Sequence, residues 1–207
     1  SGIASAEFAG IDAFSRKVVE WQEWPVPATL IMAMARQTWD EVRHAHLACG
    51  LIESYGGKIG DYPDTLAGGA PPPGVAQQGP LTRSFGARAE QMMRDPVVSL
   101  SMTNVSLEGA ALTLFQETSV VGEKIGDPLM AHCYDYNWAD EVTHTAIGDY
   151  FVRELAEDKP EEEAKALRVH AMAEFFRSRL SGDQTQELRE FFADEMQRAT
   201  AALASKG

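Results

Sequence analysis

Apolar side chains recur at steps of three and four residues along most of the chain, which is the spacing of amphipathic α-helices. This pattern predicts main helices separated by breaks that contain Pro or Gly. The main helices cover residues 4–23, 27–55, 96–123 and 128–157. Further helices are predicted over residues 160–180 and 184–205, with a short one over 81–94. The alternating pattern of a β-strand is not found, so the sequence predicts an all-α fold.

Residues 56–80 interrupt this pattern and are rich in Gly and Pro. Such a composition excludes a long helix or a central strand, and the segment is too long for a tight antiparallel turn. We therefore predict a long crossover between the second and third main helices. The expected protein is one domain over 1–207, in which a four-helix bundle covers about 4–157 and one or two extra helices follow at about 160–205.

Polar residues lie on helix faces that should be buried. The apolar stripe of the first helix consists of Ile11, Phe14, Val18 and Trp21. One turn upstream, the same face meets Glu7, and the third main helix places Glu108 on its inward face. The second and fourth main helices carry near repeats, Asp40-Glu41-Val42-Arg43-His44 and Asp140-Glu141-Val142-Thr143-His144. In each repeat a Glu and a His are three positions apart, so both side chains share one helix face.

The four Glu residues have the spacing that two antiparallel helical hairpins require. Glu7 precedes Glu41 by 34 positions, and Glu108 precedes Glu141 by 33. The midpoint of each interval falls beside a predicted helix break. Because residues equidistant from a turn lie at the same height in an antiparallel pair, each upstream Glu should face its own Glu-x-x-His. Two stacked hairpins would then bring four Glu and two His together, as in a dinuclear metal site within a helix bundle.

The candidate metal ligands are Glu7, Glu41, His44, Glu108, Glu141 and His144. Oxygen-rich ligation with one imidazole per metal suits iron or manganese better than zinc. We expect two iron ions, with a manganese–iron pair or manganese as the alternatives. Asp12 and Glu20 are alternatives to Glu7, but Asp12 is one position off the stripe and Glu20 is too close to the turn. A single Glu-x-x-His is usually a solvated charged face, and the duplication is what favours a metal site.

Neighbouring polar residues are expected to support these ligands. A ligand His usually donates its second ring N–H to a carboxylate. We therefore expect Asp40 to support His144 and Asp140 to support His44, with Arg43 paired to one of these aspartates. Other side chains share the ligand faces and are candidates for lining a substrate or oxygen pocket, although ordinary core hydrogen bonding explains them at least as well. They are Gln37, Ser101, Asn104, Phe115, Tyr134 and Asn137. The remaining histidines, His46, His132 and His170, lie off these faces.

Composition narrows the function further. The formal net charge is -13 and no basic stripe is present, which argues against a nucleic-acid partner. Cys49 and Cys133 form no Cys-x-x-Cys pair, which excludes a rubredoxin-type iron site or a zinc knuckle and favours a reducing, cytoplasmic compartment. No apolar run reaches the length of a membrane span, and we expect neither a signal peptide nor a membrane partner. Ser1 stands where a Met is expected, so the native start is left open.

With these motifs, residues of about 1–155 resemble the ferritin-like superfamily of carboxylate-bridged diiron proteins. The Asp-Glu-Val-Arg-His form of the first motif is most similar to the hydroxylase subunits of bacterial multicomponent monooxygenases, which are much longer chains. Ala48 stands where ribonucleotide reductases carry a radical tyrosine, and Val42 stands where bacterioferritins carry a haem-binding Met. The Cys-x-x-Cys pairs common in rubrerythrins are missing. The resemblance implies a helical bundle that binds two iron ions and reacts with dioxygen.

The sequence therefore favours a stand-alone diiron oxidase or oxygenase that acts on a small organic substrate. Hydroxylation, N-oxygenation and desaturation all remain open. Multiple turnover would need an electron donor, expected to be a separate ferredoxin or flavin reductase. The sequence leaves the oligomeric state open, with a homodimer as one option. The alternatives are a ferroxidase or iron-storage protein of the bacterioferritin type, and a non-enzymatic helical interaction module. The substrate itself is not identified by the sequence.

Overall fold

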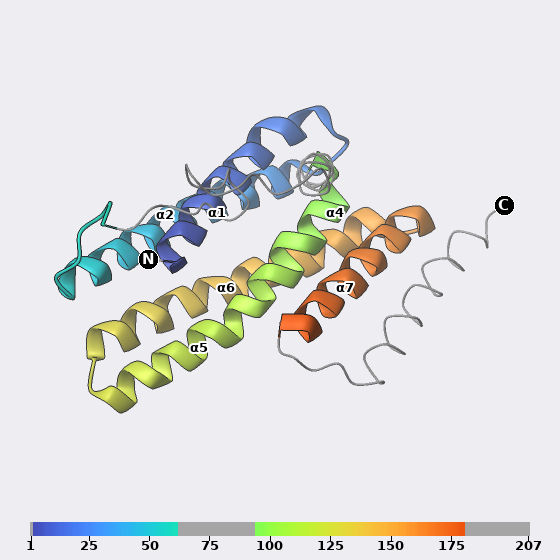
Figure 1. Ribbon diagram of the computed structural model, residues 1–207. Coiled ribbons are helices and arrows are strands. Elements are labelled where there is room, and N and C mark those ends of the chain that lie inside the picture. Colours follow the sequence, from blue (N-terminus) through green and yellow to red (C-terminus); the bar gives the residue numbers. More distant parts are fainter. Residues whose placement is uncertain (1, 62–93, 181–207) are drawn as a thin grey trace, which may run out of the picture. The chain divides into compact units, whose positions relative to one another are not determined.

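The computed structural model describes residues 2–61 and 94–180, which are drawn as coloured ribbon in Figure 1. The chain divides into two compact units. Unit 1 consists of Ser1–Arg94 with Ala111–Glu141, and unit 2 consists of Asp95–Ala110 with Val142–Gly207. All regular structure in the described ranges is helical, so the prediction of an all-α fold is confirmed. The predicted crossover over 56–80 lies mostly outside the described residues. Of the predicted short helix over 81–94 only residue 94 is described, and the predicted helix over 184–205 lies wholly outside.

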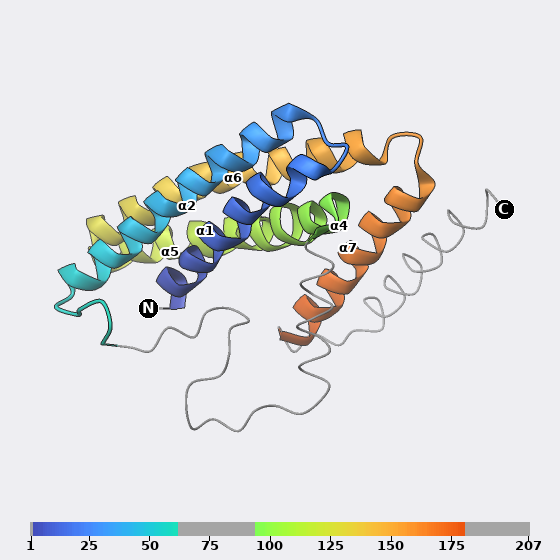
Figure 2. The same cartoon turned by 90° about the horizontal axis from the view of Figure 1, so that it is seen from above.

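Unit 1 begins with a helical hairpin. Helix α1 (Gly2–Glu20) continues into the short 3₁₀-helix η1 (Trp21–Glu23), and α2 (Ala28–Ser54) returns beside it in both views (Figures 1 and 2). Trp21 is fully buried, and its indole N–H donates a hydrogen bond to the Arg94 carbonyl at 3.1 Å. The prolines between η1 and α2 therefore fall where the sequence predicts the break, and they separate two antiparallel helices.

The buried face of α1 differs from the predicted stripe at three positions. Ile11 and Val18 are only partly buried, whereas Lys17 is almost fully buried. The Lys17 ammonium lies 4.1 Å from the centre of the Phe14 ring and 5.5 Å from that of Trp21. A lysine can occupy such a position because its long apolar stem packs like a hydrophobic residue and its charge is attracted to aromatic faces.

A second hairpin supplies the rest of unit 1. Helices α5 (Glu108–Ile125) and α6 (Pro128–Ala156) are joined at Gly126, which has a φ of +74°. The Asp127 carboxylate caps α6 by accepting a hydrogen bond from the backbone N–H of Met130 at 2.9 Å. A Cβ added to Gly122 would lie 2.6 Å from the backbone nitrogen of Ala131. The two helices therefore approach each other closely beside the turn.

The two hairpins of unit 1 pack against each other at the end of α2. Leu51, Phe115 and Tyr134 form a buried cluster, in which the two aromatic ring centres are 5.7 Å apart. On the surface nearby, the Tyr55 hydroxyl donates a hydrogen bond to the Asp127 carboxylate. These contacts fix the position of α2 along the axis of α6. This alignment brings the candidate ligands of unit 1 close together.

Unit 2 contains the largest departure from the predicted secondary structure. Instead of one α-helix over 96–123, the chain forms α4 (Pro96–Leu100), the π-helical segment η2 (Ser101–Leu107) and then α5. The Ser106 hydroxyl donates to the Ser101 carbonyl, five residues earlier, at 2.8 Å. Wider backbone spacing of this kind often marks a functional part of a helix, and the apolar pattern does not predict it.

Helix α7 (Pro160–Leu180) packs against both α4 and η2, and its bounds match the prediction. The Lys165 ammonium bonds to the Asp95 carboxylate at 2.8 Å, and Asp95 also caps α4 through the backbone N–H groups of Val97 and Val98. A Cβ added to Gly148 of α6 would lie 2.4 Å from the Cβ of Asn104. Unit 2 therefore holds η2 tightly on two sides.

One helical run in the described residues, Pro96–Ile125, is long and apolar enough to cross a membrane by length and composition alone. Within its most apolar window, 44% is buried inside the protein. The core helix of a soluble protein passes the same test, so this finding is weak evidence for a membrane. The sequence-based expectation that no membrane is involved stays a prediction.

Candidate metal centre

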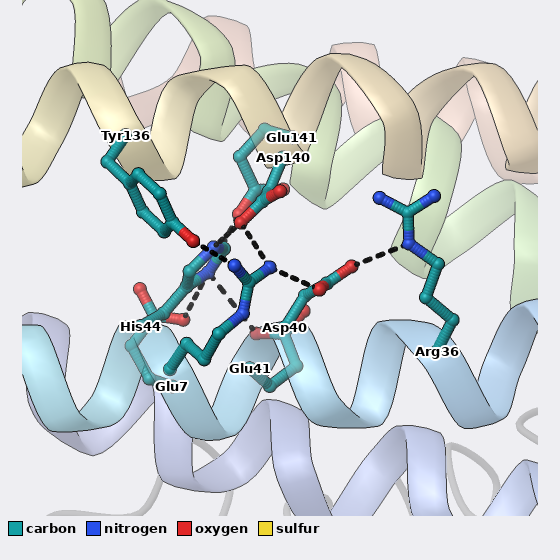
Figure 3. A network of polar contacts seen from close by, with 9 residues as sticks. Glu7, Arg36, Asp40, Glu41, His44, Tyr136, Asp140 and Glu141 are labelled. Atoms are coloured by element: carbon teal, nitrogen blue, oxygen red, sulfur yellow. Dashed lines mark hydrogen bonds and ion pairs between the residues drawn. The ribbon is translucent and has the colours of Figure 1, made fainter.

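Four of the six candidate ligands lie in unit 1, where three helices bring them together (Figure 3). Helix α1 supplies Glu7, α2 supplies Glu41 and His44, and α6 supplies Glu141. All four are buried, with exposed fractions between 0% for His44 and 5% for Glu7. Carboxylates are almost never buried to this extent unless they are paired or bind a cation. Their burial on the inner faces of packed helices is therefore a functional signal.

The imidazole of His44 is at the centre of this group. Its Nδ1 atom lies 3.5 Å from Glu7 Oε2, 3.4 Å from Glu141 Oε1 and 3.9 Å from Glu41 Oε2. One donor atom from each of Glu7, Glu41 and His44 can be chosen so that all lie within 4.8 Å of one another. The predicted approach of Glu7 to the Glu-x-x-His of α2 is present in the structure.

The second ring nitrogen of His44, Nε2, lies close to Asp140. The distance from His44 Nε2 to Asp140 Oδ2 is 3.2 Å, so the predicted contact between this aspartate and His44 is present. In the tautomer that carries its proton on Nε2, the ring donates to Asp140 and turns the lone pair of Nδ1 toward the three Glu residues. This orientation is the one that a metal-binding histidine requires.

Arg43 links the two aspartates that the sequence places beside the ligands. Its guanidinium donates to Asp140 at 2.9 Å and also to Asp40, whereas the sequence predicted a pairing with only one of them. Burial alone would lower the pKa of Arg43, but the Asp40 hydrogen bond and the charges of Asp140 and Asp40 raise it above its ordinary value. Arg36 adds a longer contact, 3.5 Å, from its Nε to Asp40.

The Tyr136 hydroxyl also accepts a hydrogen bond from Arg43, and the sequence analysis missed this residue. The Arg43 guanidinium carbon lies 5.2 Å from the centre of the Tyr136 ring. Tyr136 lies off the predicted ligand face and is 39% exposed, which explains why the apolar pattern gave no sign of it. Its position four residues before Asp140 was the available signal, because residues i and i+4 share a helix face.

The remaining two candidate ligands belong to unit 2. His144 is fully buried on α6, and the side-chain amide of Asn104 donates to its backbone carbonyl at 3.3 Å. Glu108 is partly buried and is the first residue of α5, directly after the π-helical segment η2. The predicted pairing of Glu108 with Glu141, and of Asp40 with His144, would join the two units and stays a prediction.

The candidate pocket residues are all buried, but several have structural contacts of their own. In unit 1, Phe115 and Tyr134 belong to the apolar cluster with Leu51. Burial raises the pKa of the Tyr134 phenol, and the nearby charge of Glu7 raises it further. Gln37 is fully buried, and the side-chain oxygen of Asn137 has no hydrogen-bond partner within the described residues. In unit 2, Ser101 and Asn104 are both buried. The Ser101 hydroxyl donates to the Val97 carbonyl at 2.7 Å.

The alternative residues lie elsewhere. Asp12 is exposed and pairs loosely with Arg16 at 3.9 Å, so it is not an inward carboxylate. His46, His132 and His170 are all exposed, in agreement with their predicted places off the ligand faces. Cys133 is buried and Cys49 is partly buried, and both are free thiols.

A hollow of about 550 Å³ lies at the turn between α5 and α6 in unit 1. Polar residues including Glu123, Asp127, His132 and Asp135 line it, and none of the candidate ligands is among its lining residues. Asp127 is already engaged by Tyr55 and by the N-terminus of α6. This hollow is therefore separate from the buried Glu and His group.

The donor set in unit 1 fits a hard or borderline metal ion. Three carboxylates and one imidazole share a small buried volume, and like charges at this proximity require compensation by a cation or by protons. Carboxylate oxygens with a single imidazole match the preferences of iron and manganese. No protein-family model, curated protein or solved structure was found to match this chain. The fold and site thus define an all-helical protein with a buried Glu and His cluster that can hold a metal ion.

Proposed function

We propose that this protein is a ferritin-like, carboxylate-bridged diiron oxidase or oxygenase that uses dioxygen to oxidise a small organic substrate. The observation that supports this most strongly is the buried group of Glu7, Glu41, His44 and Glu141 in unit 1, with donor atoms 3.4–3.9 Å from His44 Nδ1. Carboxylates from several helices around a histidine are the ligand set of dinuclear sites in helix bundles.

The second half of the proposed site comes from sequence. Glu108 and the Glu141-Val142-Thr143-His144 segment repeat the pattern of Glu7 and the Glu41-Val42-Arg43-His44 segment at nearly the same spacing. In the proposal, Glu108 and His144 complete the set of six ligands for two iron ions. Bound iron would supply the reactivity toward dioxygen, and the protein would supply the binding geometry and the surroundings.

The residues around the ligands have separate roles in this proposal. Asp140 holds the His44 ring and favours the tautomer whose Nδ1 lone pair can bind iron. Arg43 holds Asp140 and Asp40 in place and balances their charge. Helix packing buries the carboxylates and so excludes bulk water from them. In this proposal the buried side chains of Tyr134 and Asn137 line the substrate pocket. A ferredoxin or a flavin reductase in the cytoplasm would supply the electrons.

Oxygen uptake by the iron-loaded protein tests this function. Protein loaded anaerobically with Fe(II) would be mixed with dioxygen, with and without an artificial electron-donor system such as NADPH, ferredoxin reductase and ferredoxin. We expect uptake to continue for many turnovers only when the donor system is present, and to be lost in Glu141→Ala. The exposed residue Glu154, on the same helix, provides the control Glu154→Ala, which should behave like the wild type.

Other outcomes would contradict the proposal. Size-exclusion chromatography that shows a large multi-subunit cage, together with a single round of iron oxidation and mineral formation, would identify a ferroxidase or storage protein. A chain that binds no iron and gains no thermal stability from Fe(II) or Mn(II) would be a non-enzymatic helical module, because a ligand that binds the folded state must stabilise it.

A further inference from the structure

Gly10 lies in the middle of α1, where its presence needs an explanation. Glycine destabilises a helix interior relative to alanine, because it loses more conformational freedom on folding. Its usual advantage is a positive φ, but Gly10 is not among the glycines that adopt one. A residue other than glycine would therefore be expected here unless space is short.

The structure shows what occupies that space. A Cβ added to Gly10 would lie 2.8 Å from Oε2 of Glu41, 3.2 Å from its Cδ and 3.4 Å from its Cγ. The atom nearest to the added Cβ, Glu41 Oε2, is the same oxygen that lies 3.9 Å from His44 Nδ1. Glu7 precedes Gly10 by three positions and therefore points to the same side of α1. Gly10 thus borders the carboxylate group directly.

We propose that Gly10 is a positioning residue for the metal site: its missing side chain leaves the room in which the Glu41 carboxylate turns toward His44 and a bound metal. This inference rests on the proposed metal-binding function and adds a residue that donates no atom to the metal. A methyl group at position 10 would move the Glu41 carboxylate without breaking the fold, because the struck atoms are at the end of a flexible side chain.

Other glycines show that this situation differs from close helix packing. At Gly122 an added Cβ would lie 2.6 Å from the backbone nitrogen of Ala131, and this backbone cannot shift without moving the helix. At Gly50, in α2, an added Cβ would meet nothing within 4 Å. Gly50→Ala is therefore a matched control, because it makes the same chemical change inside a helix of the same unit without touching a ligand.

The test compares Gly10→Ala and Gly50→Ala with the wild type in two measurements. Urea denaturation of the metal-free proteins reports the fold, and anaerobic titration with Co(II), followed by its visible absorption, reports the site. We expect both variants to unfold at urea concentrations no lower than the wild type. We expect Gly50→Ala to bind Co(II) as the wild type does and Gly10→Ala to bind at least one Co(II) about ten-fold more weakly or not at all.

A double variant separates positioning from a general packing effect. Asp is one methylene shorter than Glu, so Glu41→Asp withdraws the carboxylate from position 10. The additional loss caused by Gly10→Ala should therefore be clearly smaller in the Glu41→Asp background than in the wild type. An equal loss in both backgrounds would overturn the inference.

Two further results would also overturn it, and they are distinguishable from a failure of the proposed function. In the first, the wild type binds Co(II) and Gly10→Ala binds it with the same affinity. This result would refute the positioning role of Gly10 and leave the proposed metal site standing. Gly10→Ala could instead unfold at lower urea than Gly50→Ala, which would make Gly10 a packing residue. A wild-type protein that binds no metal would overturn both the inference and the proposed function.

Discussion

The α1–α2 hairpin of unit 1 and the α4–η2 run of unit 2 both place polar residues in a buried face, but they do so differently. In the hairpin the helices are regular, and the polar residues are ionisable groups that contact one another across helices, as His44 does with Glu7 and Asp140. In the α4–η2 run the helix itself is distorted, and hydroxyl groups bond to nearby backbone carbonyls, as Thr103 does to Ser99 and Ser106 to Ser101.

This difference teaches that burial of polar residues has two separate explanations. Hydroxyls that bond to their own helix satisfy themselves locally and need no ligand. Carboxylates that converge from several helices lack such a local solution, because they repel one another unless a cation or protons are added. Unit 1 therefore carries the stronger evidence for a metal, whereas η2 shows how a helix is reshaped immediately before Glu108.

The largest expected effect is on the carboxylate network of unit 1. Asp140→Ala removes the group that orients His44 and holds Arg43. Loss of such a supporting carboxylate typically weakens metal binding about 10- to 100-fold, and we expect a decrease of that size in an Fe(II) or Co(II) titration. Asp149→Ala, on the same helix, removes only an exposed pair with Arg153 and should leave the affinity unchanged. Equal affinities in both variants would contradict the role of Asp140.

The next effect concerns close packing in unit 2. Gly148→Ala would place a methyl group 2.4 Å from the Cβ of Asn104 and 3.2 Å from its backbone carbon. Because neither atom can move freely, we expect a loss of about 1–3 kcal/mol in the free energy of unfolding, as for other overpacked sites. Urea denaturation of the metal-free protein measures it. A gain in stability, as expected for Gly50→Ala, would show that η2 is not held tightly against α6.

A smaller effect separates the π-helical segment from ordinary helix. Ser106→Ala removes the hydroxyl that bonds to the carbonyl five residues earlier, and we expect a loss of about 0.5–1.5 kcal/mol. The control is Thr118→Ala in α5, where the hydroxyl bonds to the Leu114 carbonyl four residues earlier, the ordinary α-helical spacing. That change should stay within about 0.5 kcal/mol. Similar losses at both sites in urea denaturation would contradict a special role for the Ser106 hydroxyl.

The smallest effect concerns the surface contact between the two hairpins of unit 1. The hydrogen bond to Asp127 raises the pKa of Tyr55 from about 10 to about 12. The protonated phenol is therefore favoured in the folded state, so its contribution to stability is complete below pH 10 and is lost as the pH rises through 12. The measurement is the ultraviolet absorbance titration of the wild type and of Tyr55→Phe. The difference between the two curves should show one phenol that ionises near pH 12. Ionisation near pH 10 would contradict this contact.

Much of the fold follows from the sequence because helices of this length carry strong periodicity. The α1–α2 hairpin and the Gly126 turn were predictable from apolar spacing and from Pro and Gly at the breaks. The η2 segment was not, because a change from α to π spacing alters the backbone without altering the apolar pattern. The burial of Lys17 was not predicted, because the stripe was drawn through apolar residues and the apolar stem of a lysine does not count in it.

The candidate site was partly predictable for the same reasons. The duplicated spacing identified Glu7 as a candidate ligand, although it lies near the chain start. The partnership of Asp140 with His44 was also expected from the sequence. Tyr136 was missed because it lies off the predicted ligand faces, and Gly10 because it has no side chain; both act through the residue next to them. Such residues become visible only when the distances between helices are known.

The most direct test of the central claim is metal content, measured by mass spectrometry on protein purified without chelator and on its Glu41→Ala, Glu141→Ala and Glu154→Ala variants. We predict two irons, or one iron and one manganese, per wild-type chain. We predict the same content in the Glu154→Ala control and loss of metal in the other two variants. Little metal in the wild type, even after anaerobic loading with Fe(II), would contradict the account and leave the buried Glu and His residues as a purely structural cluster.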